Sequence, residues 1–183
     1  MRTGVARSKP SITHVPALAC LIHGALPPSV SFRARSVVDA LLLTAGSLGG
    51  TQQIAQRLGL GDRFALCRLL RRDGLPPFRR LRSWINVIHW SWTRSHLGHS
   101  LEHSAFVDGR TPASCYRLVR RLTGEPWRMV ASRGTGWLIE RFSEEVHSEN
   151  EKRRHRRGGL VHLSILSREL RKPGHRGSVV ELS

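Results

Sequence analysis

The chain has 183 residues, of which 39% are hydrophobic, so it can build one or two small domains with a modest core. It carries 30 basic and 13 acidic residues, a formal net charge of +17 that favours polyanionic partners. No run approaches the ~20 apolar residues of a membrane span. Cys20, Cys67 and Cys115 show no Cys-x-x-Cys spacing, which argues against a zinc ribbon or a disulfide framework and favours the cytoplasm.

The first part of the chain predicts a lead segment and two helices. Residues 1–32 are rich in Ser, Pro and Gly without a sustained period, which predicts a poorly ordered lead. Apolar residues then recur at helical spacing over 35–45. Thr51 is a suitable N-cap for a short helix that continues through Leu58.

A second and a longer helix follow the turn around Gly59. Asp62 can cap a helix that runs to about Arg72, and Gly74 suits the left-handed residue after its end. From Pro77 to about His96, apolar residues recur at spacings of three and four. Such a helix spans roughly 30 Å, close to the ~34 Å between successive major-groove faces of DNA.

The same order of elements returns in the second half. Ser100 caps a short helix, and Thr111 followed by Pro112 is a strong start for another. A closing helix is expected over 137–145. The chain then becomes polar and basic, with five Lys or Arg residues between positions 152 and 157, and 146–183 is predicted to be a largely disordered basic tail.

A short pattern therefore occurs twice, about fifty residues apart. Each copy has a short helix with an alanine, a glycine turn, an arginine-rich helix, and then glycine and proline. The alanines and turn glycines match at an offset of fifty, whereas the second helices match at forty-nine. The second copy is thus expected to lose one residue in its turn. This order of elements is typical of a helix-turn-helix, and two copies in a basic chain indicate a DNA-binding protein.

The arginine-rich helices are expected to bury one face and expose the other. The inward stripes are Leu66, Leu69 and Leu70 in the first copy and Cys115, Leu118, Val119 and Leu122 in the second. The candidate DNA-binding residues lie opposite these stripes: Arg63, Phe64, Cys67, Arg68, Arg71, Ala113, Ser114, Arg117 and Arg121. Arg68 and Arg117 are the leading candidates for guanine or phosphate contacts. The alternative is that these arginines form a solvated basic face with no ligand, and that arginine is frequent in the chain because of codon bias.

The stretch Thr111-Pro-Ala-Ser-Cys-Tyr-Arg-Leu-Val-Arg-Arg-Leu-Thr-Gly-Glu-Pro126 resembles the DNA-binding domain of AraC/XylS-type transcription regulators. Leu58-Gly-Leu, Arg68-x-Leu and Gly74-Leu-Pro-Pro-Phe-Arg resemble the first unit and the start of the connecting helix. The resemblance covers roughly 36–130. It implies an all-α domain over 33–145, with helix-turn-helix subdomains at about 36–76 and 98–130 joined by a linker helix over 77–96. The termini, 1–32 and 146–183, are expected to be disordered and basic.

The resemblance also implies a function. Recognition helices over 62–72 and 112–123 would enter successive major grooves of double-stranded DNA, with RNA polymerase as a further partner and neither a cofactor nor a membrane. Members of the family commonly carry a separate effector-binding or dimerisation domain. Because nothing before residue 33 is long enough for one, no small-molecule effector is expected for this chain. It either acts without a sensed ligand or is a remnant of a larger regulator.

Three departures from the family pattern are present. Gly61 stands where a serine or threonine cap is usual, although Asp62 can take that role. Arg110 follows Gly109 where an apolar residue usually packs between the helices, and His103 and Ser104 occupy positions that are normally more apolar. These substitutions predict a loosely packed second unit.

Other functions have weaker support. His99 and His103 have the spacing of a helical metal pair but lack the glutamate of His-Glu-x-x-His, so no metal is expected. An enzyme is not expected, because the sequence has no Gly-x-Ser-x-Gly, no phosphate-binding glycine loop and no carboxylate pair in an apolar setting. A charge-driven protein that binds nucleic acid without sequence preference remains the alternative to a regulator.

Overall fold

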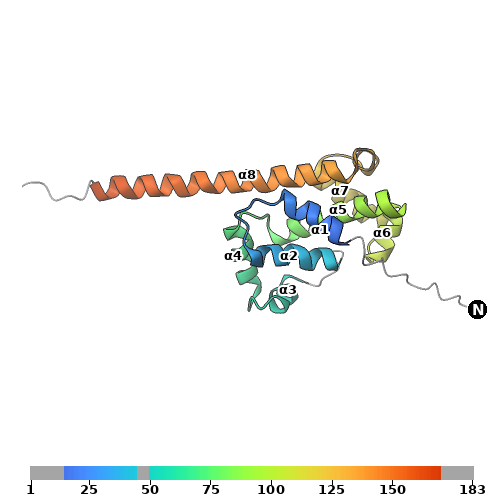
Figure 1. Ribbon diagram of the computed structural model, residues 1–183, viewed down its shortest axis with the longest axis horizontal. Coiled ribbons are helices and arrows are strands. Elements are labelled where there is room, and N and C mark those ends of the chain that lie inside the picture. The colour runs from blue at the N-terminus through green and yellow to red at the C-terminus, as the bar shows by residue number, and fades with distance from the viewer. Residues whose placement is uncertain (1–14, 45–49, 170–183) are drawn as a thin grey trace, which may run out of the picture. The chain divides into compact units, whose positions relative to one another are not determined.

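The structure is a computed structural model that describes the backbone of residues 15–44 and 50–169 and the side chains of residues 16–44 and 50–151. The described residues form eight helices and no strand (Figure 1), so the predicted all-α class is confirmed. The helices are α1 (Val15–Ala25), α2 (Phe32–Leu43), α3 (Thr51–Arg57), α4 (Arg63–Arg72), α5 (Phe78–Leu97), α6 (Leu101–Val107), α7 (Pro112–Thr123) and α8 (Trp127–Glu169).

Three predicted helix starts agree with the structure, whereas α2 begins at Phe32, capped by the Ser31 side chain, and not at about Arg35 as predicted. Asp62 caps α4, Ser100 caps α6 and Thr111 caps α7, each by accepting a hydrogen bond from the backbone N–H three residues on. The α3 start differs by one residue, because Gly50 is the N-cap and Thr51 is already helical. Strong local signals thus set the boundaries of these elements.

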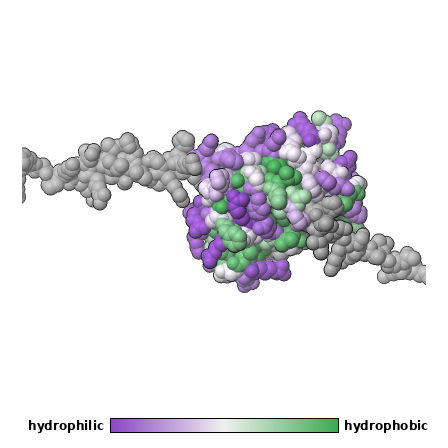
Figure 2. All heavy atoms as spheres, in the orientation of Figure 1, coloured by the Kyte–Doolittle hydropathy of each residue, from purple (hydrophilic) through white to green (hydrophobic). Residues whose placement is uncertain are grey.

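Helix α1 corrects the prediction of a poorly ordered lead over 1–32. Its residues Leu18 and Ile22 are buried, and Leu26 just after it is buried as well. The helix is apolar nearly all round, and Figure 2 shows hydrophobic residues gathered near the middle of the surface, where Figure 1 draws α1. Its inward face therefore packs into the core, although it lacks an amphipathic period. Residues 1–14 lie outside the described part of the chain.

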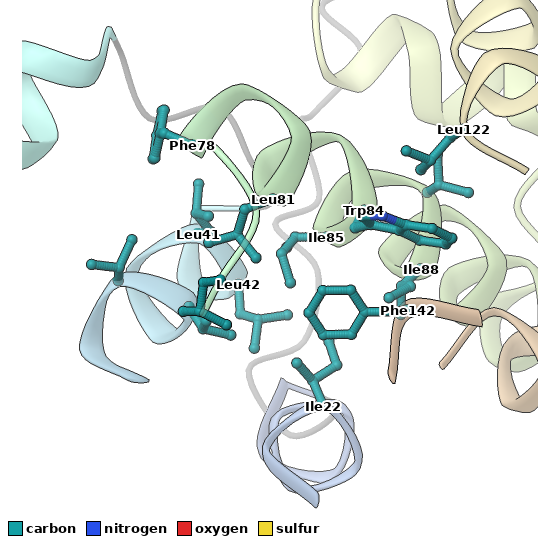
Figure 3. Packing of buried hydrophobic residues seen from close by; sticks show 14 of the residues in the cluster. Ile22, Leu41, Leu42, Phe78, Leu81, Trp84, Ile85, Ile88, Leu122 and Phe142 are labelled. Carbon is teal, nitrogen blue, oxygen red and sulfur yellow. The ribbon is translucent and has the colours of Figure 1, made fainter. Parts of the chain in front are cut away.

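The core is built around α5. Ten of its twenty residues are buried, and α2, α4, α6 and α7 all pack against it. Figure 3 shows Leu81 of α5 beside Leu41 of α2, and Ile85, Trp84 and Ile88 of α5 around Phe142 of α8. The helix thus joins the elements before it to those after it.

Helix α8 corrects two predictions at the C-terminal end. The closing helix was expected over 137–145 and a disordered tail over 146–183, whereas α8 runs from Trp127 to Glu169. Gly134 interrupts it with φ 80° and ψ −179°, so two helical segments meet there at a kink. The chain divides after Asn150 into two units, 1–150 and 151–183, so the first extends beyond the predicted domain over 33–145 at both ends. Residues 170–183 lie outside the described part.

A buried carboxylate joins the end of α4 to the start of α2. Asp73, whose side chain is 5% exposed, accepts hydrogen bonds from the Ser31 backbone N–H (2.9 Å), the Ser31 hydroxyl and the Arg72 Nε (2.9 Å). Burial raises the pKa of the Asp73 carboxyl, but the hydrogen bonds from Ser31 and Arg72 outweigh it and hold the pKa below its ordinary value. Asp73 therefore stabilises the folded state in its ionised form.

We expect Asp73→Asn to lower the free energy of unfolding by about 1–3 kcal/mol at neutral pH, because an amide meets the same buried donors without charge. A lowered folded-state pKa gives stability that is lost as the pH falls through that pKa, so the difference between wild type and variant should shrink below about pH 4. Urea unfolding followed by circular dichroism measures both effects. Asp62→Asn is the control, since asparagine caps a helix equally well; a loss as large for Asp62→Asn would contradict the role of Asp73.

Candidate nucleic-acid interface

The turn between α3 and α4 is set by glycine and by backbone hydrogen bonds. Gly59 has φ 64°, in the left-handed region, and the Leu60 N–H donates to the Ala55 carbonyl at 2.8 Å. Gly61, with φ 73°, adds one more residue before Asp62 caps α4. On α3, the Gln52 side chain accepts from the backbone N–H of Arg63 at 3.1 Å, which ties the two helices at the start of α4.

The turn between α6 and α7 has the same backbone geometry. Gly109 has φ 64°, and the Arg110 N–H donates to the Ala105 carbonyl at 2.8 Å. Thr111 follows directly as the cap of α7, so the residue that corresponds to Gly61 is missing. The prediction that the second turn is one residue shorter is confirmed. The two helix pairs thus share one way of turning the chain, despite having leucine in one copy and arginine in the other.

The inward faces of α4 and α7 are those predicted. Every residue of the two predicted stripes is buried, with exposures between 0% and 9%: Leu66, Leu69, Leu70, Cys115, Leu118, Val119 and Leu122. The second pair is therefore as closely packed as the first, which corrects the expectation of loose packing. Ser104 is buried at 7% beside Ala105, so its small side chain fits the interface with α7.

All five predicted residues of α4 lie on its exposed side: Arg63, Phe64, Cys67, Arg68 and Arg71. Phe64 is 56% exposed, and the Arg63 guanidinium lies 4.7 Å from the centre of its ring, in cation–π range. An exposed phenylalanine beside several guanidinium groups combines an apolar contact surface with positive charge. This is the combination that a surface for reading base edges and phosphates needs.

On α7, Ala113, Arg117 and Arg121 are exposed, as predicted, and Ser114 is not fully so. The Ser114 hydroxyl donates to the Thr111 carbonyl at 2.7 Å, and its backbone N–H donates to the Thr111 hydroxyl. Ser114 is thus part of the cap, and its hydroxyl is less free for a ligand than the prediction assumed.

Among the exposed residues of α7 that the predicted set leaves out are Tyr116 and Arg120. Arg120 is three residues after Arg117, so helical spacing alone could have placed it on the same side. The Tyr116 hydroxyl donates a hydrogen bond to the carboxylate of Glu102 on α6, and this bond lowers the pKa of Glu102. Tyr116 thereby ties α7 to α6, and no local pattern in the sequence signals that contact.

Within the described side chains, the predicted DNA-binding arginines of these two faces form no ion pair with an acidic side chain. Arg72, Arg80, Arg133 and Arg141 do form such pairs, and none of them belongs to the predicted DNA-binding set. The predicted arginines therefore keep their charge available for an external anion.

Arg110, in the turn between α6 and α7, packs against α5. Its guanidinium lies 5.8 Å from the centre of the Trp90 ring, and the Trp90 indole N–H donates to the Asp108 carboxylate at 2.8 Å. Burial raises the pKa of Asp108 against the opposing effects of that hydrogen bond and of the Arg110 charge. Arg110 thus packs on an aromatic face and compensates a half-buried carboxylate.

The histidine pair gives no support for a metal. The His99 and His103 rings lie 4.2 Å apart, and burial together with the neighbouring His103 lowers the pKa of His99. Among the residues that the structure describes, no group of three or more His, Cys, Asp or Glu side chains could hold a metal ion.

No family model, curated protein or solved structure matches the chain. The resemblance to AraC/XylS-type regulators thus stays a prediction that depends on the residues and their geometry. A separate finding concerns the membrane: none of the helices in the described part combines the length and the apolar character needed to cross a bilayer.

We expect Asp108→Ala to lower the free energy of unfolding by about 1–3 kcal/mol, because the mostly buried Trp90 indole N–H loses its acceptor. Asp108→Asn keeps an oxygen acceptor at the same place and should cost less than half as much. Urea unfolding of the two variants measures the difference. Equal losses for both would show that the charge of Asp108, and not its hydrogen bond, matters.

Proposed function

We propose that the chain is a sequence-specific DNA-binding transcription regulator of the AraC/XylS type. In this proposal α3–α4 and α6–α7 are helix-turn-helix subdomains, α5 is the linker helix, and α4 and α7 are the recognition helices. The binding partner is double-stranded DNA, and RNA polymerase is the further partner of such a regulator.

The observation that carries the proposal is the repeated turn with its repeated basic face. Both turns have a glycine at φ 64° and a 2.8 Å hydrogen bond back to a buried alanine. Each turn leads into a helix that buries a short apolar stripe and exposes arginines that form no ion pair with the acidic side chains the structure describes. A chain that binds polyanions by charge alone has no need to present its arginines on two matched helices.

The positions along each helix suggest different roles. Bases are reached from the start and middle of a recognition helix, so we assign contacts with base edges to the exposed Phe64 and Arg68 on α4 and to Ala113 and Arg117 on α7. To Arg121, one turn further along α7, we assign a phosphate contact. With its 20 residues α5 is roughly 30 Å long, which suits two recognition helices in successive major grooves.

Selection from random duplex DNA at about 150 mM salt tests the proposal, since binding driven only by charge is much weakened there. We expect two short motifs about one helical turn apart to be enriched. Enrichment of one motif would limit sequence reading to one helix pair. Failure to enrich any motif, with binding that disappears as salt rises, would support the alternative, a charge-driven protein or the remnant of a larger regulator.

We expect Arg117→Ala to weaken binding to the selected site by about 1–3 kcal/mol, with a smaller effect on random DNA, because a bidentate contact to a base is lost. Titration of both duplexes measures the two affinities. Arg141→Ala is the matched control: Arg141 is also exposed, but it lies on α8 and pairs with Glu144 at 3.1 Å. An equal loss on selected and random DNA would instead make Arg117 a phosphate contact.

A further inference from the structure

We infer that the long segment of α8, residues 135–150, is a strut that fixes the position of α4 relative to α7. If the proposed function holds, the strut restricts the protein to one spacing between its two half-sites. The mechanical part of this inference does not depend on DNA, whereas the part about spacing rests on the proposed function.

The need for a strut arises at the ends of α5. The first helix pair joins α5 through residues 73–77, and the second joins it through residues 98–100. Gly74 and Gly98 at these joints have φ 75° and 68°. A single helix is stiff along its length, whereas a short glycine-containing joint at each end is where a hinge would lie, so the angle of each pair depends on the side-chain contacts across its joint.

The long segment of α8 runs antiparallel along α5 and binds it at successive points. The Thr135 hydroxyl donates to the Ser91 hydroxyl at 3.1 Å, in a buried contact. Further along, the Phe142 ring lies 5.9 Å from the Trp84 ring. From Thr135 to Phe142 of α8, the contacted residue of α5 therefore changes from Ser91 back to Trp84, toward the first helix pair.

The strongest point of attachment is Glu145. Its carboxylate accepts two hydrogen bonds from Arg80, at 2.5 and 2.8 Å, and one from the Trp84 indole N–H at 2.9 Å. The Glu145 side chain is 19% exposed and the Arg80 side chain 47%, so the carboxylate is partly shielded from water while the guanidinium stays about half exposed. It fixes the rotation of α8 about its own axis as well as its distance from α5.

The strut reaches from one helix pair to the other. It follows α7 through the short segment that begins at Trp127, and it ends against Gly74, directly after α4. A Cβ atom built on Gly74 would overlap the side chain of Asn150. α8 thus passes across the joint between α4 and α5, which α5 by itself does not restrain.

Helix α1 holds the strut from a second side. The Ser143 hydroxyl donates to the Ala25 carbonyl at 3.1 Å, and Figure 3 shows Ile22 of α1 pointing toward Phe142. His23 is hydrogen-bonded to Asp39 of α2 at 2.5 Å. The strut is therefore connected to α5 directly and to α2 through α1. A pivot of the first helix pair would break contacts with both of these helices.

A fixed relation between α4 and α7 has a direct consequence for DNA. Each base pair inserted between two half-sites turns them by about 35° and separates them by about 3.4 Å. A protein whose recognition helices cannot move apart or rotate loses one of its two contacts at the altered site. The selected spacing is then part of the recognised sequence.

The mechanical part is tested in the full chain without DNA by spin labelling and distance measurement. Labels are placed on Cys67 and on Ala113→Cys, both exposed, in a Cys20→Ser background. Cys115 is buried, which raises the pKa of its thiol and protects it from the label. Glu145→Lys places two positive charges together and detaches the strut. Glu144→Lys makes the same charge change at the adjacent residue, which pairs only with Arg141 among the described side chains.

We expect a narrow distance distribution for the reference protein and for Glu144→Lys, and a clearly broader one for Glu145→Lys. A broad distribution in the reference protein, or a narrow one in folded Glu145→Lys, would overturn the inference. If Glu145→Lys loses its helical circular dichroism, the distance measurement is repeated on Glu145→Gln, which removes the charge but keeps the shape of the side chain. A broad distribution in Glu145→Gln then supports the inference, and a narrow one overturns it.

The spacing is tested on the selected duplex with one or two base pairs inserted or removed between its motifs. The unlabelled wild type and Glu144→Lys should lose about tenfold or more in affinity, as for other defects in a recognised site, and Glu145→Lys much less. Equal tolerance in all three would refute the effect on spacing while leaving the proposed function intact. If selection yields no motif, the proposed function fails, and the distance measurement still decides whether the strut exists.

Discussion

The burial of α5 is the constraint on which the rest of the structure depends. Burying one apolar side chain of the size of valine or larger contributes about 1.5–3 kcal/mol, and α5 alone buries seven: Phe78, Leu81, Trp84, Ile85, Val87, Ile88 and Trp90. These residues do not share one narrow stripe, so no single neighbour can cover them. α2, α4, α6, α7 and α8 each cover a part, and α1 closes the core over Phe142. The position of each basic face therefore follows from how its helix pair packs against α5.

The two helix pairs have the same backbone geometry at their turn glycines, but different tertiary contacts anchor them. In the first pair, Asp73 at the end of α4 accepts hydrogen bonds from Ser31 at the start of α2. In the second, Trp90 of α5 donates to Asp108 at the end of α6, and Arg110 covers the indole. Burial acts on both carboxylates, yet the pKa of Asp73 is lowered and that of Asp108 is raised, because Asp73 receives more hydrogen bonds. A repeated local motif can thus be combined with different tertiary contacts.

The parts of the fold that the sequence predicts are those with local signals. Capping residues such as Asp62 and Thr111, the turn glycines, and apolar stripes at helical spacing all act within one or two turns, and each appears in the structure. Helix α1 escaped prediction because it is apolar on nearly every side and therefore has no period. The extent of α8 escaped prediction because Gly134 and Gly136 weaken its local signal, whereas its attachment depends on the pairing of Glu145 with Arg80, sixty-five residues away.

The candidate site shows the same division. The exposed arginines of α4 and α7 follow from the buried stripes, so they could be predicted from spacing alone. The bonding of Ser114 within its cap and of Tyr116 to Glu102 depends on side-chain geometry, which spacing does not contain. These contacts show where the few acidic residues are used. Asp62, Asp73 and Glu145 cap a helix or hold two helices together, and none of the three forms an ion pair with a predicted arginine among the described side chains. A chain with a net charge of +17 attracts any polyanion, but keeping its carboxylates at structural joints leaves positive charge concentrated on the two faces that α5 and α8 hold in place.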